Sequence, residues 1–558
     1  MIGDLLSGAG VLVVGAASAI ALLAGPSRAR SAAMLAALLL APVLVFGDQW
    51  DSRQILDLRD DPPRLLALGG AAALAVGLLA ALFRSRPQLL ALGLLAAIPF
   101  RTPLHSGGDQ ANLLLPLYIV IAAAAITVAL RDRGVRRGAA ATTAPAGPEA
   151  WVARALAAFV LLYALQVLYS DDFSKGLQNV CFFIAPFSLV FALLSDFRWD
   201  RRLLTAALIV VTAEALVFSL VAFVEYATRD LLWNEAVIRS NQFHVYFRVN
   251  SLFWDPNVFG RYLAIAIVFL VAALLWSRRD RTAVALGAAA LVLWLALATT
   301  FSQSSFAALV AGLAVLCALR WSLRWTLLGC AGAALAVAAV AVIAGFDFST
   351  ENKVNKDTGG RANLISGGFD LFVDRPVWGY GSGSFAKAFR AHASRRPAVS
   401  ESHSEPVTVA AEQGIVGLLA YLALLLAAFA TLCSGLRRTM PGLQRGPPAG
   451  GAAGGSPPRA MPVAQGRGVP AATGPAGRAA TGPAGPSATG PAGRAAVLAA
   501  FVALLVHTMA YAGFFEDPFT WVVLAVGVSL AAAERRGWGT DAAPPGRPAA
   551  GDPVRAPA

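Results

Sequence analysis

Side chains that could perform chemistry gather in three short stretches of a mostly apolar chain. The first stretch runs from Arg248 to Asn257, the second begins at Gly359-Gly360-Arg361, and the third runs from His403 to Pro406. An arginine guanidinium binds phosphate oxygens through two parallel hydrogen bonds, and an imidazole can accept a proton from a hydroxyl near neutral pH. The three stretches therefore suit a substrate that carries a diphosphate and reacts with a hydroxyl.

Each stretch also has a structural interpretation. The sequence Asp255-Pro256-Asn257 is typical of a helix start, with a capping side chain beside a proline. Arg248 could extend its charged end to the lipid headgroups instead of holding an anion. His392 competes with His403 for the role of a base, because both lie in the same expected loop. These alternatives stay open on the sequence alone.

The remaining motifs exclude two kinds of site. The stretch from Gly379 to Gly383 permits a tight turn with outward N–H groups. It lacks the lysine and the strand-to-helix context of a phosphate-binding loop, so we do not expect nucleotide binding. The four cysteines form no Cys-x-x-Cys pair, and the polar stretches hold no clustered carboxylates or His/Cys set. We therefore predict neither a metal site nor a cofactor.

The rest of the chain has the composition of a membrane protein. Hydrophobic residues make up 57% of it and charged residues 14%, against about 25% charged residues in soluble proteins. The apolar residues fall in blocks of about 17–25, a length that crosses about 30 Å of hydrocarbon as a helix. We predict an all-α, polytopic transmembrane helix bundle of about fifteen spans. They are expected near 5–24, 31–46, 65–83, 87–99, 112–130, 151–168, 178–195, 202–224, 258–276, 283–298, 305–319, 326–344, 407–432, 496–512 and 517–533.

Arginine clusters occur in alternate loops, which predicts an orientation. By the positive-inside rule these loops are cytoplasmic, so the N-terminus is expected outside and the C-terminus inside. The formal net charge of +13 is spread over the clusters and forms no single patch, so we do not expect a nucleic-acid partner. The clusters are Arg28/Arg30, Arg84/Arg86, Arg131/Arg133/Arg136/Arg137, Arg198/Arg201/Arg202, Arg278/Arg279/Arg281, Arg320/Arg324, Arg437/Arg438 and Arg535/Arg536.

Two predicted external loops, 225–257 and 345–406, are long and mix aromatic with charged residues, so we expect them to be folded and partly helical. The segment 439–495 is rich in Gly, Pro and Ala and is predicted to be a disordered cytoplasmic linker. The expected organisation is then an N-terminal transmembrane bundle, a core with both loops, the linker, a C-terminal transmembrane hairpin and a disordered tail. Their ranges are 1–200, 201–435, 439–495, 496–534 and 535–558.

The two long loops should share one face of the membrane, because four predicted spans separate them. Arg248, Arg361 and His403 can therefore meet there without violating the topology. The two arginines would neutralise a leaving diphosphate, and the histidine could take the proton of an attacking hydroxyl.

In this order and in these loops, the motifs resemble those of the O-antigen ligase and polymerase superfamily. The resemblance covers roughly 200–435. It comprises an arginine followed by Asp-Pro-Asn (248–257), a Ser-rich turn (299–305), and Gly-Arg, an apolar run, Pro and Gly-x-Gly (360–385). It also includes His403, followed nine and eleven residues later by Glu412 and Gly414. The resemblance implies a ligase-like core within the membrane bundle.

The resemblance also implies an activity. Such a protein is a metal-independent glycosyltransferase that moves saccharide from a polyprenyl-diphosphate carrier to an acceptor hydroxyl. Arg248 and Arg361 would contact the diphosphate, His403 would be the essential histidine, and Asn257 and Ser404 would bind substrate beside them. The expected partners are the lipid-linked glycan, an acceptor glycan or glycolipid, and membrane lipid. The reaction would occur on the external or periplasmic face of the cell membrane, in cell-envelope polysaccharide assembly.

The chain departs from the family pattern in ways that leave ligase and polymerase open. Gln303 stands where many members have arginine, Ser404 follows the histidine where asparagine is common, and the expected span count exceeds that of typical ligases. The main alternative is a transporter or flippase of lipid-linked oligosaccharide, in which Glu214 within a span would act as a relay. A non-catalytic assembly scaffold is the third interpretation, and it would need no convergent Arg/Arg/His set.

Overall fold

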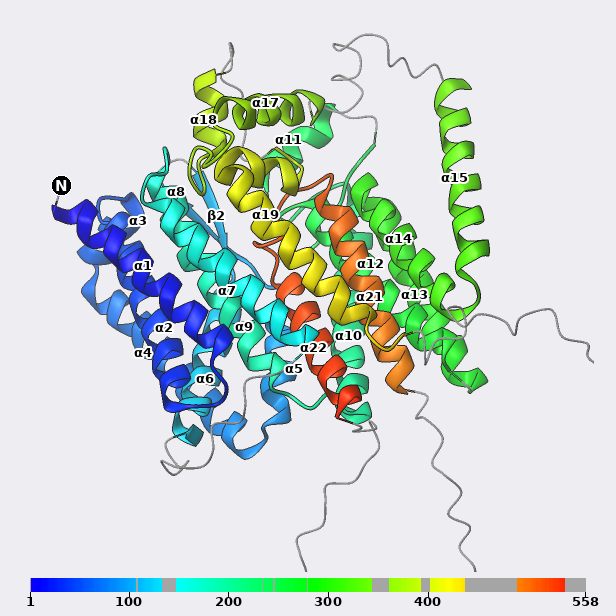
Figure 1. Cartoon of the computed structure of the whole chain (residues 1–558), viewed down its shortest axis with the longest axis horizontal. Coiled ribbons are helices and arrows are strands. Elements are labelled where there is room, and N and C mark those ends of the chain that lie inside the picture. The colour runs from blue at the N-terminus through cyan, green and yellow to red at the C-terminus, as the bar shows by residue number, and fades with distance from the viewer. Residues whose placement is uncertain are drawn as a thin grey trace, which may run out of the picture.

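The computed structural model describes residues 2–106, 109–132, 147–232, 234–243, 246–277, 279–343, 361–392, 402–436 and 489–536. Helices dominate these ranges and pack side by side as a bundle (Figure 1). Thirteen of the described helices are long and apolar enough to cross a membrane. The predicted all-α, polytopic transmembrane bundle is thus confirmed.

The helices of the first half are α1 (Ile2–Leu23), α2 (Arg28–Asp48), α3 (Arg53–Asp60), α4 (Pro62–Ser85), α5 (Gln88–Ala97), α6 (Leu115–Asp132), α7 (Pro148–Val167), α8 (Phe173–Asn179), the π-helical segment η1 (Val180–Ile184), α9 (Ala185–Ser195), α10 (Arg201–Thr228) and α11 (Glu235–Phe243). Those of the second half are α12 (Pro256–Leu275), α13 (Asp280–Thr300), α14 (Gln303–Arg320), α15 (Leu323–Ile343), α17 (Arg361–Asp374), α18 (Phe385–His392), α19 (Glu405–Cys433), α21 (Thr489–Thr508) and α22 (Pro518–Arg535).

The expected count of about fifteen spans differs from the thirteen for a simple reason. The predicted span at 87–99 is the short apolar helix α5, and the one at 326–344 is α15, which stands at the edge of the bundle in Figure 1. The predicted span at 178–195 begins earlier, as α8, and continues through η1 into α9. One element was not anticipated: an antiparallel hairpin of β1 (Thr102–Ser106) and β2 (Asp109–Leu113) between α5 and α6.

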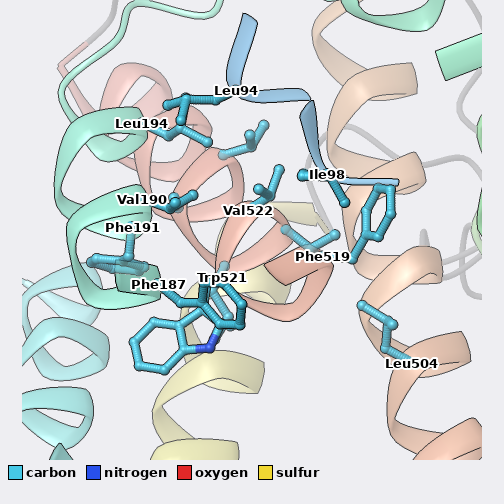
Figure 2. Packing of buried hydrophobic residues seen from close by; sticks show 14 of the residues in the cluster. Leu94, Ile98, Phe187, Val190, Phe191, Leu194, Leu504, Phe519, Trp521 and Val522 are labelled. Carbon is cyan, nitrogen blue, oxygen red and sulfur yellow. The ribbon is translucent and has the colours of Figure 1, made fainter. Parts of the chain in front are cut away.

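One apolar core runs through the helices from both halves of the chain. Figure 2 shows α5, α9, α21 and α22 meeting around Phe191, Phe519 and Trp521. Small residues let neighbouring backbones approach, as expected between membrane helices. A Cβ on Gly312 of α14 would lie 2.6 Å from Val268 of α12, and a Cβ on Gly15 of α1 would lie 2.6 Å from Ala164 of α7. These contacts fix how α12, α14 and α21 pack beneath the polar stretches.

Ion pairs join helix ends on the predicted cytoplasmic side. Arg30 of α2 binds Asp196 after α9 and the Ala192 carbonyl, and Ser31 donates to Asp132 of α6 at 2.6 Å. At the same side, Arg494 of α21 pairs with Glu534 of α22. Arg30 and Arg494 are buried, whereas Asp196 and Glu534 are exposed, so the pairing offsets the cost of removing the two guanidinium groups from water.

The extramembrane helices α11, α17 and α18 lie together at the opposite end of the bundle, the end at which α1 also begins (Figure 1). The loops 225–257 and 345–406 are therefore partly helical, as expected, in their described parts. The predicted linker lies outside the described residues up to 488, and the predicted tail lies outside them from 537. The division at residue 200 stays a prediction, although α19 packs against α7 and α22 against α9, across that boundary.

Candidate functional site

Arg248 is held by three elements around it. Its Nε donates to the Thr300 carbonyl at the end of α13 (2.9 Å), and its Nη2 donates to Oδ1 of Asn257 in α12 (3.0 Å). Its backbone is fixed by Asn241 of α11, whose amide accepts from the Arg248 N–H (3.1 Å) and donates to its carbonyl (2.9 Å). This half-buried guanidinium is built into the protein, which disfavours the interpretation of an arginine that merely reaches lipid headgroups.

A buried carboxylate shapes the loop that presents Arg248. Oε2 of Glu225 in α10 accepts the N–H groups of Asn250 (3.2 Å) and Ser251 (2.7 Å). Ser251 has a φ of +52° and donates its hydroxyl to the Phe218 carbonyl at 2.8 Å. Because two consecutive N–H groups point at one carboxylate, the backbone turns sharply just after Arg248. This contact was not predicted from the sequence, in which Glu225 is the first residue of the predicted loop 225–257.

The Asp255-Pro256-Asn257 turn has the structural role expected of it. Asp255 caps α12 by accepting the Asn257 N–H at 2.6 Å, and Pro256 occupies the first helical position. Asn257 also takes part in the site, because its side chain accepts from Arg248 and its carbonyl accepts from the Ser305 hydroxyl at 3.3 Å. The helix-start interpretation is confirmed for Asp255 and Pro256, and the predicted contact of Asn257 with substrate stays a prediction.

The Ser-rich turn forms a buried hydroxyl network beside Asn257. The hydroxyl of Ser302 lies 3.2 Å from that of Ser304 and 2.7 Å from that of Ser305. Ser304 in turn lies 3.2 Å from Nε2 of His507 in α21. Gln303, where many family members have arginine, is exposed at the start of α14. The network links α12, α14 and α21 directly below Arg248.

The first residue of α17, Arg361, is electrostatically coupled to the two other predicted site residues. Burial lowers the pKa of Arg248, and the charge of Arg361 lowers it further, whereas Asp255 and Tyr246 raise it. Burial also lowers the pKa of His403. The charge of Arg361 lowers that pKa further, and Asp255 raises it. The structure thus brings Arg248, Arg361, His403 and Asp255 into one electrostatic cluster, although the two arginines and the histidine are far apart in sequence.

His403 lies just before the N-terminal end of α19, in a turn with a strained backbone. It has a φ of +61°, a conformation that side chains other than glycine seldom adopt, and such strain is often retained where function needs it. Ser402 stabilises the turn by donating its hydroxyl to the Ser404 carbonyl at 2.7 Å and accepting the Ser404 N–H at 3.1 Å. Ser404 is buried at the N-cap of α19 and makes no side-chain capping bond. Its predicted contact with substrate stays a prediction.

Tyr511 is a residue of this cluster that the sequence analysis missed. It lies between α21 and α22, and its ring centroid is 6.0 Å from that of His403 and 5.6 Å from that of His507. It also interacts electrostatically with Arg248 and with the half-buried Arg101, which follows α5. The fold brings these residues together, because Arg101 and Tyr511 lie outside the three polar stretches that carry the motifs.

The glycine turn at 379–383 binds an internal carboxylate. Glu412 of α19 is buried and accepts the N–H groups of Gly383 (2.8 Å) and Phe385 (3.0 Å). Its carbonyl accepts from Gly381 at 2.8 Å. Gly414 has a φ of +63°, and a Cβ there would lie 2.3 Å from the Val377 carbonyl oxygen. The spacing of His403, Glu412 and Gly414 thus fixes the loop before α18 against the helix that carries the histidine.

Two competing residues belong to other environments. His392 of α18 lies 3.1 Å from the Tyr380 hydroxyl and 2.9 Å from the Ala388 carbonyl, and Tyr380 donates to Asp374. Within the described residues, the hydrogen bonds of His392 thus connect α18 to the segment that joins it to α17. Glu214 accepts the hydroxyl of Tyr262 at 3.0 Å within the bundle, which favours internal pairing over a relay. Within the described ranges, no three His, Cys, Asp or Glu side chains cluster as a metal site would require.

The comparisons with known proteins bear on this cluster. Residues 288–422 match the family model described as O-Antigen ligase. The matched segment runs from α13 into α19 and contains Arg361, His403, Glu412 and the Ser-rich turn. No curated protein matches the chain. The match supports the resemblance predicted from the motifs, for the part of the chain that it covers: this multi-pass membrane protein contains a segment similar to the O-antigen ligase family, and Arg248 and Asn257 lie before that segment.

Proposed function

We propose that the protein transfers saccharide from a polyprenyl-diphosphate carrier to an acceptor hydroxyl on the outer face of the membrane. The observation that carries this proposal is the series of contacts from Arg248 through Asn257, the Ser-rich turn, His507 and Tyr511 to His403. The charge of Arg361 acts on both ends of this series, and most of these residues lie within or beside a segment that matches the O-antigen ligase family. A positive cluster next to a histidine suits a reaction that releases diphosphate and takes up a proton.

The arginines would hold the leaving group. In the described structure, two of the five N–H groups of Arg248 have acceptors, Thr300 and Asn257. These bonds orient the guanidinium, and its other N–H groups could bind phosphate oxygens. Arg361 adds a second charge from α17. Because Arg248 is oriented before substrate arrives, it would stabilise the negative charge that grows on the diphosphate in the transition state, and the charge of Arg361 would add to this effect.

His403 would act as the general base. Burial and the charge of Arg361 lower its pKa, so the imidazole is neutral and able to accept a proton near pH 7. The acceptor oxygen then forms a bond to the anomeric carbon while the bond from that carbon to the diphosphate oxygen breaks. The electron pair of the broken bond goes to the diphosphate, and the hydroxyl proton goes to His403.

The test is incubation of the purified protein with a polyprenyl-diphosphate oligosaccharide, followed by measurement of product mass. A longer lipid-linked chain identifies a polymerase, and transfer to a second glycan or glycolipid identifies a ligase. In proteoliposomes, movement of the intact donor between leaflets without a new glycosidic bond would overturn the proposal and identify a flippase.

A further inference from the structure

The loop 509–517 between α21 and α22 reaches the proposed site from outside the matched family segment. Its Tyr511 ring is tilted by 49° to the His403 ring and by 55° to the His507 ring, at centroid separations of 6.0 and 5.6 Å. Both separations lie within the range of about 4.5–7 Å that favours contact between aromatic rings. The half-buried tyrosine thus lies between a predicted catalytic histidine and a histidine of the hydroxyl network.

A buried carboxylate ties this loop to the helix start that carries His403. Oε2 of Glu405 accepts the N–H groups of Gly513 (2.7 Å) and Phe514 (2.9 Å), and Glu405 is only 6% exposed. Glu405 follows His403 by two residues, so the two bonds set the distance between the histidine turn and Tyr511. A charge-assisted bond to a backbone N–H is stronger than a neutral one, which makes this connection rigid.

The far end of the loop is anchored in the core. The Phe515 ring stacks on Phe159 of α7 at 3.8 Å, and the Phe515 carbonyl accepts the indole N–H of Trp521 at 3.0 Å. Phe514 packs edge-on against Tyr421 of α19 at 5.6 Å. The loop is held just after Tyr511 by these contacts and just before it by the Ala510 N–H, which donates to the His507 carbonyl at 3.1 Å. The tyrosine ring therefore has a defined place against the imidazole.

We propose that Tyr511 is a positioning residue of the transfer site, whose ring seats the His403 imidazole and shields it from water. This role rests on the proposed function, because it gives His403 the geometry of a base. Among the described residues, the charged and aromatic groups near His403 include Arg361 from α17, Asp255 before α12 and Tyr511 from the loop. The Tyr511 ring packs against the imidazole at a tilt of 49°.

The first measurement does not depend on transfer activity. Diethyl pyrocarbonate acylates neutral imidazole, and peptide mass mapping after labelling at about pH 8, above the ordinary histidine pKa of about 6.5, gives the rate at His403. Y511A should raise that rate several-fold, because the ring no longer covers the imidazole, while Y511F should leave it unchanged. The matched control is Y226A, which removes another half-buried tyrosine, one whose ring lies on Arg229.

The second measurement is the transfer reaction of the same variants. Y511A should lower kcat on the order of 10- to 100-fold with little change in KM, as expected when a catalytic group is displaced. It should also move the acid limb of the pH profile upward, because burial is the larger cause of the lowered pKa of His403. Y511F should have a kcat near that of the wild type, because it keeps the ring. If Y511A does not fold, Y511L replaces it, because leucine preserves much of the side-chain bulk but lacks the aromatic ring.

The outcomes separate this role from the proposed function. Unchanged labelling of His403 in both Y511A and Y511L would overturn the positioning role, whatever the transfer rates. A loss in Y511F equal to that in Y511A would overturn it as well, because the hydroxyl would then be the acting group. Absence of transfer by the wild-type protein would refute the proposed function, and the labelling rates would still decide the place of Tyr511.

Discussion

At the scale of residues, the charge of Arg361 lowers the pKa of both Arg248 and His403. Arg361 therefore acts on the predicted diphosphate-binding arginine and on the predicted base. Arg248 owes its place to Thr300, Asn241 and Asn257, and Arg361 is the first residue of α17. The two arginines therefore approach the proposed site from different elements of the fold.

Substitution R361K tests the contribution of the planar fork. Lysine keeps the charge but lacks the paired N–H groups of the planar guanidinium. Transfer should therefore fall by about 10- to 100-fold, which corresponds to the free energy of one hydrogen bond to a charged group. The measurement is kcat/KM with a polyprenyl-diphosphate donor. The control R390K changes an exposed arginine of α18 and should have no effect. Equal activity of R361K and wild type would exclude a bidentate contact.

The pH dependence of transfer tests the state of His403. Its pKa is lowered from 6.5 by burial first and by Arg361 second. A base must be neutral, so activity should be complete at pH 7 and should fall only as the pH drops through a value below 6.5. In R361Q, one cause of the lowering is removed, and the acid limb of the residual activity should move to higher pH. A limb that stays in place would show that another group titrates.

At the scale of elements, the stability of the site depends on how α19 holds the loop before α18. Glu412 accepts two buried N–H groups of that loop. Substitution E412A would leave both without an acceptor, at a net cost of about 1–3 kcal/mol. We expect a lower melting temperature and faster proteolysis in the segment 375–392. The control D370A removes an exposed carboxylate of α17. Unchanged proteolysis in E412A would contradict the structural role of Glu412.

The sequence predicted the elements better than their contacts. Long apolar blocks and the Asp255-Pro256-Asn257 cap predicted where the membrane helices begin, because helix length and capping are local properties. The pairing of Glu225 with the Arg248 loop and of Glu405 with the Tyr511 loop depends on which helices become neighbours. Neither carboxylate forms a recognisable motif with its partner, because the partner is a backbone N–H that every residue except proline possesses.

At the scale of the whole molecule, the arginine pattern predicts that the α17 end is external. A reporter that is active only in the cytoplasm should be active when fused after Arg438 and silent when fused at Ser366 of α17. The control is expression of both fusions at equal level. The reverse pattern would place Arg248, Arg361 and His403 on the cytoplasmic side and would exclude transfer on the outer face.

The site as a whole was partly predictable. Topology alone placed Arg248, Arg361 and His403 on one face, and electrostatic coupling through Arg361 agrees with that placement. Arg101 and Tyr511 were not predictable, because one follows a short helix near the start of the chain and the other lies between the last two spans. A single arginine or tyrosine in a loop carries no pattern, and only the packing of α5, α21 and α22 brings them near the site.

The most direct test of the account is the release of polyprenyl diphosphate by the purified protein in excess EDTA. We predict one carrier released for each new glycosidic bond, with no need for added divalent metal, because Arg248 and Arg361 neutralise the leaving group. In H403A the rate should fall by about 10²–10⁴-fold, while H392A, whose imidazole contacts Tyr380, should release carrier at the wild-type rate. Full release by H403A, or release that requires a divalent metal, would contradict the account.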